Sequence, residues 1–250
     1  MAERNPIFTR TELMLGTATL EALQRTRVAI FGLGGVGSWC AESLVRSGVG
    51  RLMLVDSDRI CVTNVNRQLM ATTKTVGQVK VEALAARLHE INPDVALDVR
   101  QKIYDVTTAA EFDFSEWDYV IDAIDSLESK AYLIRHALSV PTVTLFASMG
   151  AALKMDPFQI RQSVFTKVEG DGLARALRQK FRQTGGIPER PFVCVWSPEQ
   201  RKNRGVKDSR GNGTVAHTTA IFGFALAGLV VTDVERRVTA GCDSMRPAAT

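Results

Sequence analysis

A glycine-rich turn lies between the first apolar run of the chain, Val28–Phe31, and a helical pattern from Val36 to Ser47. In this strand–turn–helix setting a Gly-x-Gly-x-x-Gly run is typical of phosphate binding. Glycines let the backbone approach a phosphate, and free amides at a helix start attract its negative charge. The turn, which predicts a nucleotide site at the start of a strand–helix–strand unit, reads Gly32-Leu33-Gly34-Gly35-Val36-Gly37-Ser38.

Apolar runs alternate with helical patterns through the first 147 residues. Strict alternation favours a parallel sheet with right-handed crossovers. We therefore predict an α/β fold, a Rossmann-like doubly wound sheet whose ligand lies at the carboxyl ends of the strands. The predicted strands are Val28–Phe31, Leu52–Val55, Val95–Val99, Tyr119–Ile121 and Thr142–Phe146, and the helices are Val36–Ser47, Val76–Ile91 and Leu127–Leu138.

The pattern changes after Pro141 to shorter elements. We expect a single domain over residues 1–240, with 1–150 as the nucleotide-binding half, 151–240 as a C-terminal lobe of short strands and helices, and 241–250 as a flexible tail. The features of the second half are apolar runs at Leu153–Met155, Gln159–Phe165 and Phe192–Trp196, a basic helix at Gly172–Gln183, a polar loop at Pro198–Gly213 and a final apolar helix.

The final apolar stretch, Thr214–Val231, is close to the ~18 residues at which a membrane span is considered. His217 and the small residues Gly223, Ala225 and Gly228 favour a buried core or dimer helix instead, while membrane association stays open as an alternative. With 45% hydrophobic and 23% charged residues the chain is ordinary for a soluble domain. The N-terminus lacks the apolar core of a secretory signal, so we expect a cytoplasmic protein.

The four cysteines, Cys40, Cys61, Cys194 and Cys242, form no Cys-x-x-Cys pair. This spacing argues against a structural zinc site and gives no sign of a disulfide framework. Free cysteines are among the most buried residue types, so we expect buried thiols.

Polar residues after the glycine turn separate two nucleotide classes. The turn and Asp56, which stands where a ribose hydroxyl would be held, fit NAD and ATP equally. Arg67 and Lys80 offer cations to a triphosphate, and Asp125 offers a carboxylate to Mg²⁺, which usually binds through one or two carboxylates plus substrate phosphates. Each residue alone could be a surface charge or a helix cap, but in combination they favour ATP with magnesium.

Together these motifs resemble the ubiquitin-activating-like (ThiF/MoeB/HesA) superfamily of adenylating enzymes. The resembling segments are Gly-x-Gly-Gly-Val-Gly-Ser, Leu-Val-Asp-x-Asp, Asn-x-Asn-Arg-Gln, Val-Gly-Gln-x-Lys and Asp-Ala-Ile-Asp. Arg10 resembles an arginine that reaches into the partner subunit's site, so the resemblance implies a homodimer with Arg10, Arg67, Lys80 and Asp125 in catalytic roles. It also implies ATP-Mg binding by Gly32, Gly34, Gly35, Gly37, Asp56, Asn66, Arg67, Gln68, Lys80 and Asp125.

The second half is similar to the tRNA threonylcarbamoyladenosine dehydratase branch. That branch adenylates a threonyl carboxylate on an adenosine beside the anticodon and closes a ring with net loss of water. The resemblance therefore implies a tRNA substrate, and it leaves cysteine-desulfurase or sulfur-acceptor partners possible. The segments that carry it are Ser148-Met149-Gly150-Ala151, Lys154-Met155-Asp156-Pro157, Asp171-Gly172-Leu173-Ala174 and Cys194–Glu199.

The chain departs from the branch pattern at Val164, Val168, Gly172 and Asp208, which puts the exact acceptor in doubt. Basic residues could follow a tRNA backbone, because phosphate contacts by Lys and Arg supply most sequence-independent affinity. The alternative is a solvated helix face and a loop. The basic residues concerned are Arg175, Arg178, Arg201, Lys202 and Arg204.

Two other functions compete. Adenylation of the C-terminus of a ubiquitin-like sulfur-carrier protein is one, although its activators often carry two Cys-x-x-Cys pairs that this chain lacks. An NAD-dependent oxidoreductase is the more distant one. His89, His136 and His217 all fall in predicted helices, which leaves no evident proton-transfer residue at the strand ends.

Overall fold

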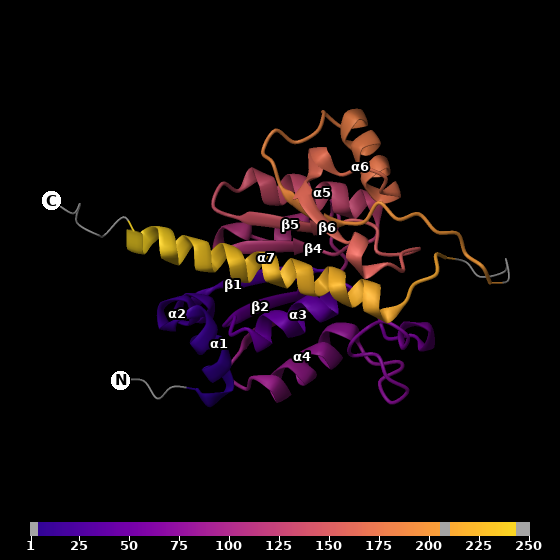
Figure 1. Ribbon diagram of the computed structural model, residues 1–250. Helices are drawn as coiled ribbons and strands as arrows, with labels where there is room; N and C mark the ends of the chain where they lie inside the picture. The colour runs from indigo at the N-terminus through magenta and orange to yellow at the C-terminus, as the bar shows by residue number, and fades with distance from the viewer. Residues whose placement is uncertain (1–4, 206–210, 244–250) are drawn as a thin grey trace.

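The structure, a computed structural model, describes residues 5–205 and 211–243. Within these ranges one seven-stranded sheet forms the centre of the molecule (Figure 1). Its strands, in spatial order, are β3 (Ala96–Arg100), β2 (Arg51–Val55), β1 (Arg27–Phe31), β4 (Tyr119–Asp122), β5 (Thr144–Ser148), β7 (Val193–Trp196) and β6 (Arg161–Val164).

The first five strands run parallel, with β1 paired to β2 on one side and β4 on the other. Ile30 of β1, for example, is in register with Leu54 and with Ile121. Chain order proceeds outward from β1 to β3 and then returns to β4, so the connections after β1 and β4 leave the sheet in opposite directions. This arrangement confirms the predicted doubly wound sheet and opens a crevice at the switch point.

Helices cover both faces of the sheet. Alternate residues of β1 and β2 point to opposite faces, so Ile30 and Leu54 join a core with α2, α3, α4 and α7, whereas Phe31 and Val55 join a core with α5 and α6. The helices are α1 (Thr9–Leu15), α2 (Thr17–Arg25), α3 (Gly37–Arg46), α4 (Lys80–Ile91), α5 (Leu127–Ser139), α6 (Gly172–Gln183) and α7 (Ala216–Asp243).

The second half of the chain extends the same sheet. β7 pairs parallel to β5, and β6 pairs antiparallel to β7. The run Leu153–Met155, predicted as a short element, has no strand pairing. Sequence periodicity could not show that the later strands continue the first sheet, because pairing partners lie far apart along the chain.

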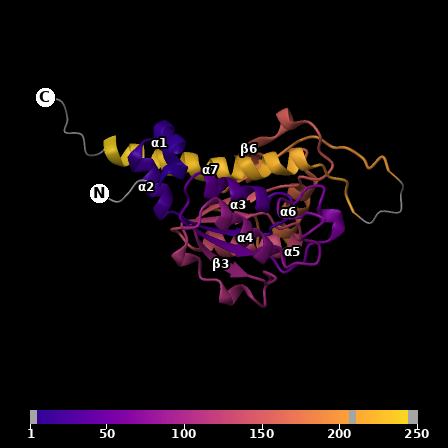
Figure 2. The same ribbon diagram turned by 90° about the horizontal axis from the view of Figure 1, so that it is seen from below.

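The apolar helix α7 lies along one side of the molecule, beside α1 and α2 (Figure 2). By length and composition it could cross a membrane, but half of the apolar window is buried inside the protein. Phe222, Leu226 and Val230 belong to the core. At Gly223 a Cβ would meet the carbonyl oxygen of Val36 at 2.5 Å, so only glycine allows this approach to α3. The predicted buried helix is therefore confirmed.

Several element boundaries differ from the prediction. The helix expected from Val76 begins at Lys80, because Gly77 adopts a φ of +89° and its amide bonds to the carbonyl of Ile60, which forms a turn. The helices α1 and α2 were not predicted. α7 continues through Asp243, so residues 241–243 of the expected tail are helical, and 244–250 lie outside the described residues.

The cysteine expectation holds at two of its positions. Cys40 and Cys194 are buried free thiols, and burial raises the pKa of both. Cys61 is exposed, so the prediction of burial was wrong there, because it lies in the loop after β2. The Cys242 side chain lies outside the described residues.

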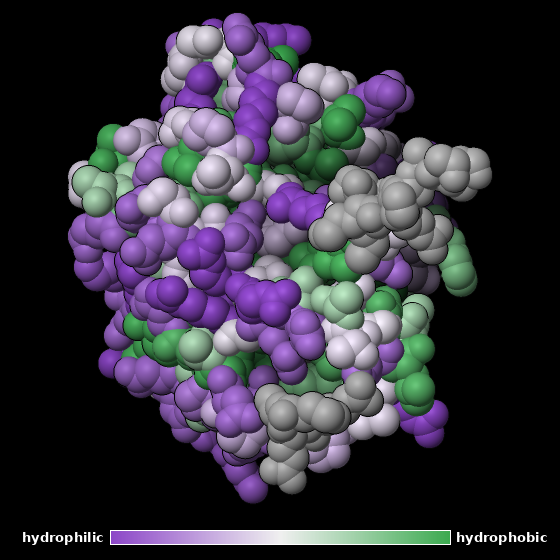
Figure 3. Space-filling view, turned by 90° about the vertical axis from the view of Figure 1, so that its left-hand side faces the viewer, coloured by the Kyte–Doolittle hydropathy of each residue, from purple (hydrophilic) through white to green (hydrophobic). Residues whose placement is uncertain are grey.

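The face seen in Figure 3, which is the left-hand side of Figure 1, is mostly hydrophilic, with hydrophobic side chains in small separate groups. α1 contributes two exposed hydrophobic side chains, Leu13 and Met14, which are 75% and 85% exposed. Scattered exposed apolar residues are normal on a protein surface, but two neighbours of this size on one short helix suit a contact surface.

Candidate functional site

A cleft of about 1400 Å³ opens at the carboxyl ends of β1, β2, β4 and β5. It occupies the crevice that the topology creates. The loops after these strands, residues 203–205 and 211–214, and the start of α7 supply its walls. The lining includes nine of the ten residues predicted to bind ATP-Mg: Gly32, Gly34, Gly35, Asp56, Asn66, Arg67, Gln68, Lys80 and Asp125.

The glycines of the turn have different roles. Gly32 has a φ of +85°, and a Cβ there would lie 2.6 Å from the carbonyl oxygen of Ala123. A Cβ on Gly37 would lie 1.9 Å from the carbonyl oxygen of Gly32. Gly37 therefore packs against the turn itself and is not among the described residues that line the cleft, while the phosphate role predicted for it stays a prediction. At Gly34 the nearest atom to a Cβ would be 3.8 Å away, on Gln68, so this position leaves open space for a ligand.

The side chains of Asp56 and Lys80 lie close together at the carboxyl end of β2. The Asp56 carboxylate accepts hydrogen bonds from the amides of Leu33, at 2.7 Å, and Asp58, at 2.9 Å. Lys80 is buried at the first position of α4, and its Nζ lies 2.7 Å from Asp58 and 3.8 Å from Asp56. Asp58 was not predicted as a site residue, although it is the second acid of the Asp-x-Asp pair. Acids thus hold the Lys80 ammonium at the cleft.

The Asn66–Gln68 segment forms another wall. Arg67 Nη1 donates to the carbonyl of Thr63 at 2.8 Å and to Asn66 Oδ1 at 2.9 Å. Gln68 is buried, and its Oε1 has no hydrogen-bond partner among the described residues. A buried unsatisfied oxygen that lines a cleft is suited to accept a hydrogen bond from a ligand.

Asp125 lies exposed at the cleft in the loop after β4. Ser126, and not Asp125, is the N-cap residue of α5, which removes the simple capping explanation. The described residues contain no group of three or more side chains able to hold a metal. One carboxylate beside a phosphate site nevertheless fits magnesium, which keeps several waters and takes further ligands from phosphates.

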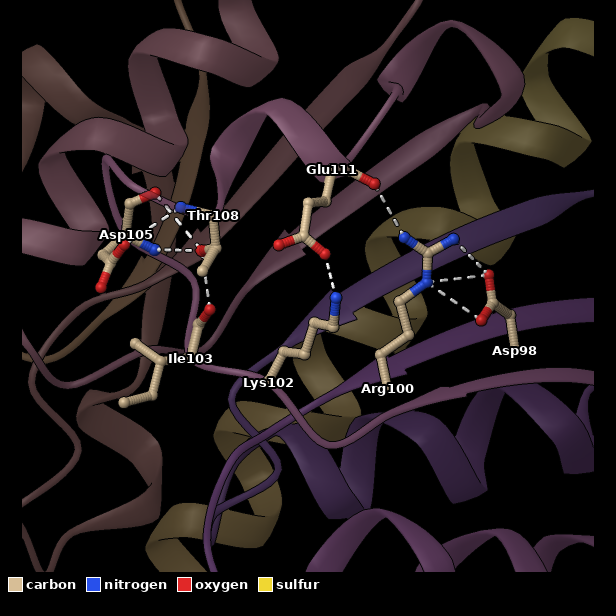
Figure 4. A network of polar contacts seen from close by, with 7 residues as sticks. All are labelled: Asp98, Arg100, Lys102, Ile103, Asp105, Thr108 and Glu111. Atoms are coloured by element: carbon tan, nitrogen blue, oxygen red, sulfur yellow. Dashed lines mark hydrogen bonds and ion pairs between the residues drawn. The ribbon is translucent and has the colours of Figure 1, made fainter.

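The segment after β3 forms part of the cleft wall, and its role was not predicted. Lys102, Ile103 and Tyr104 line the cleft. Lys102 pairs with Glu111, Arg100 donates to the carbonyl of Glu111 at 3.1 Å, and Thr108 Oγ1 donates to the carbonyl of Ile103 at 2.8 Å (Figure 4). These bonds hold an irregular segment in one conformation, which no helical or strand periodicity could reveal.

The basic residues of the second half divide into two groups. Arg178 donates to the carbonyls of Phe165 and Val168 and lies 5.1 Å from the centroid of the Phe165 ring. Its guanidinium is therefore bonded within the fold, and the tRNA contact predicted for it stays a prediction. The residues that remain exposed are Arg175, Arg201, Lys202 and Arg204.

A smaller cavity of about 410 Å³ adjoins the cleft and shares Gly150 and Leu173 with it. Arg175 and Arg201 line this cavity, and Arg201 pairs with Glu199 at 2.5 Å. Arg204 lines the nucleotide cleft itself. Three of the four exposed cations, Arg175, Arg201 and Arg204, therefore line one cavity or the other.

Glu199 anchors the segment that follows β7. Its Oε2 accepts hydrogen bonds from the amides of Met155, at 2.7 Å, and Asp156, at 2.9 Å. These bonds lower the pKa of Glu199 to about 2. Lys154 is buried, donates to the carbonyl of Ser197 at 2.8 Å and has a lowered pKa because of its burial.

Three of the departures from the branch pattern, Val164, Val168 and Gly172, are not among the described residues that line the cleft. Val164 ends β6, and Val168 is buried after the short helix η6 (Phe165–Lys167). Gly172 begins α6, where a Cβ would meet nothing within 4 Å. Asp208 lies outside the described residues.

Arg10 lies on α1, before β1, and is exposed. It is not among the described residues that line the cleft. α1 lies at the other end of the molecule from residues 198–205 (Figure 1). Arg10 therefore does not act in the cleft of its own chain.

The fold and the cleft together define a nucleotide-binding α/β enzyme with cations and a carboxylate around a glycine turn. The sequence pattern of the ThiF family matches residues 9–242, and this chain belongs to that family.

Several proteins similar to this chain share the same name. The tRNA threonylcarbamoyladenosine dehydratase of Bacillus subtilis is 43% identical over 178 residues, which cover 71% of this chain and 70% of that protein. The protein of the same name from Escherichia coli is 37% identical over 199 residues, with 77% and 73% covered. The crystal structure of the E. coli dehydratase, TcdA, in complex with ATP superposes with a TM-score of 0.84 at 32% identity over 96% of both chains.

Proposed function

We propose that this protein uses ATP to dehydrate threonylcarbamoyladenosine in tRNA, next to the anticodon, to a cyclic product. One observation carries the proposal: the likeness to the ATP-bound dehydratase covers 96% of both chains and therefore includes the second half. That half supplies Leu173 and Arg204 to the cleft. The nucleotide half alone would fit any adenylating enzyme.

The reaction requires the protein to align the carboxylate with the α-phosphorus of ATP and to neutralise the charge on the leaving pyrophosphate. A threonyl carboxylate oxygen bonds to the α-phosphorus of ATP as pyrophosphate leaves. A heteroatom of the carbamoyl group then attacks the activated acyl carbon, AMP leaves, and the carbamoyl group releases one proton to water. In this scheme Lys80 and Arg67 oppose the charge that develops on the phosphates, while the Gly34 backbone lets the phosphates approach.

Magnesium belongs to the same proposal. Asp125 would hold it at the rim of the cleft, beside the glycine turn. When bound, the metal would supply positive charge that offsets part of the negative charge of the phosphates. The binding of ATP should then tighten on addition of Mg²⁺.

The tRNA backbone would follow the exposed cations from Arg175 and Arg201, at the smaller cavity, to Arg204 in the cleft, with Lys202 between them. Neutralising phosphates releases counterions, so affinity should fall linearly with the logarithm of the salt concentration. The proposed tRNA substrate agrees with the cytoplasmic location and with residues 151–240 as the substrate-facing lobe.

A homodimer is the proposed assembly. Arg10 lies outside the cleft of its own chain, and Leu13 and Met14 expose apolar surface on the same helix. A dimer that covers these side chains would bring Arg10 toward the partner's cleft. Each site would then be complete only in the assembly.

The test uses the protein with ATP, Mg²⁺ and tRNA that bears linear threonylcarbamoyladenosine, followed by digestion and mass measurement of the nucleoside. We expect a product lighter by one water, with one AMP released per product. The matched control is Lys80→Ala, which should bind tRNA and form no product. An unchanged nucleoside with intact ATP binding would refute this substrate and favour another carboxylate, such as a sulfur-carrier C-terminus.

A further inference from the structure

A lysine occupies a core position of α5. The buried side of this helix consists of Lys130, Ala131, Leu133, Ile134 and Ala137. Lys130 is 0% exposed, in line with apolar residues three, four and seven positions later. Lysines are almost never fully buried unless they are paired, so a lysine in such a stripe needs a specific partner.

Its partners lie in the loop that carries Asp125. Lys130 Nζ lies 2.8 Å from Asp122 Oδ2 and donates to the carbonyl of Ile124 at 3.0 Å. Asp122 Oδ1 accepts a hydrogen bond from the Ile124 amide at 3.1 Å. The two charged side chains therefore hold both polar groups of Ile124 while they pair with each other, with Asp122 also 0% exposed.

These contacts fix a short piece of the cleft wall. Ala123, Ile124 and Asp125 all line the cleft. The Ala123 carbonyl also faces Gly32, where a Cβ would come within 2.6 Å of it. A shift of the Ile124 peptide would therefore move the Asp125 carboxylate. It would also disturb the contact between the Ala123 carbonyl and Gly32 of the glycine turn.

We propose that Lys130 is a positioning residue that clamps Ile124 and so directs the Asp125 carboxylate at the metal on the phosphates. The inference rests on the proposed metal role of Asp125 and deepens it. A buried ion pair is often replaceable by apolar residues without loss of stability, so stability alone does not explain a charged pair here.

The test measures ATP binding by calorimetry with Mg²⁺ and with EDTA, which gives the tightening of the ATP Kd by the metal. Lys130→Met keeps the length of the buried chain and removes the ammonium. The double variant Asp122→Asn/Lys130→Met also removes the charge that the single variant would leave unpaired. Lys180→Met, which removes a partly exposed ammonium paired with Glu128, is the matched control.

We expect Lys130→Met to lower the unfolding temperature and the double variant to recover most of that loss. In both variants the tightening by Mg²⁺ should fall at least fivefold, while the Kd in EDTA stays within twofold of wild type. Wild-type tightening in a folded double variant would overturn the proposal. Absence of tightening in the wild-type protein would overturn it too, and would leave tRNA dehydration, which the nucleoside mass reports separately, unaffected.

Discussion

Substitution by alanine should have different effects at two glycines of the same turn, on stability at Gly37 and on ATP binding at Gly34. On Gly37 the new Cβ would lie 1.9 Å from the carbonyl oxygen of Gly32, a backbone atom that no rotamer change can move. On Gly34 the nearest atom would be 3.8 Å away, and the new methyl would enter the cleft. The first change therefore tests packing, and the second tests the approach of a phosphate.

The expected shifts in unfolding temperature follow from these contacts. Overpacking costs about 1–3 kcal/mol, and a backbone clash belongs near about 3. At about 2–4 °C per kcal/mol for a chain of this size, Gly37→Ala should unfold about 6–12 °C below wild type. Gly34→Ala should stay within about 2 °C of it, because substitutions without a clash usually change stability by less than about 0.5 kcal/mol.

The assay is thermal unfolding with and without ATP-Mg. At 100 times its Kd, a ligand stabilises by about 2.7 kcal/mol, which raises the unfolding temperature of wild type by about 5–11 °C. If the methyl weakens ATP binding 100-fold, Gly34→Ala should rise by only about 1 °C at the same concentration. A wild-type rise in Gly34→Ala, or wild-type unfolding of Gly37→Ala, would refute the division of roles.

Three further predictions concern residues outside the turn. Arg178→Ala should cost about 1–2 kcal/mol in thermal unfolding, because it removes two backbone hydrogen bonds and a ring contact. Arg175→Ala should leave the unfolding temperature unchanged and reduce by about one the slope of log affinity for tRNA against log salt concentration. Equal changes in stability and in this slope for Arg175→Ala and Arg178→Ala would contradict the division between a phosphate contact and a packing residue. For Glu199→Gln, the lowered pKa means that the carboxylate stabilises the fold above about pH 4.3 and loses this effect as pH falls toward about 2. The difference in free energy of unfolding between wild type and Glu199→Gln, measured in urea, should vanish as pH falls over that range. A difference that stays constant with pH would exclude a stabilising role of the Glu199 carboxylate. Finally, mixed Arg10→Ala and Lys80→Ala subunits should regain about a quarter of wild-type dehydration through heterodimers with one intact site; no regain would reject the shared site.

The sequence determined the first half of the fold and most of the candidate site. Alternation of apolar runs and helical patterns is a local property, and it was sufficient to predict the parallel sheet. The positions of Asp56, Lys80 and Asp125 at element ends followed, because the carboxyl ends of parallel strands meet at one edge. All three line the cleft.

Tertiary structure decided what depends on close approach between distant segments. Gly37 and Gly34 look alike in the sequence, and only the position of the Gly32 carbonyl separates packing from ligand space. Arg178 reads as a surface charge until its carbonyl partners are placed beside it.

The same limit applies to Lys130, which periodicity places on the core side of α5 but whose partners come from the preceding loop. The strands β6 and β7 could be recognised as apolar runs, yet their place in the sheet depends on pairing with β5 across many intervening residues. Local patterns record which surfaces a segment must bury. Which neighbour buries them is a property of the whole fold.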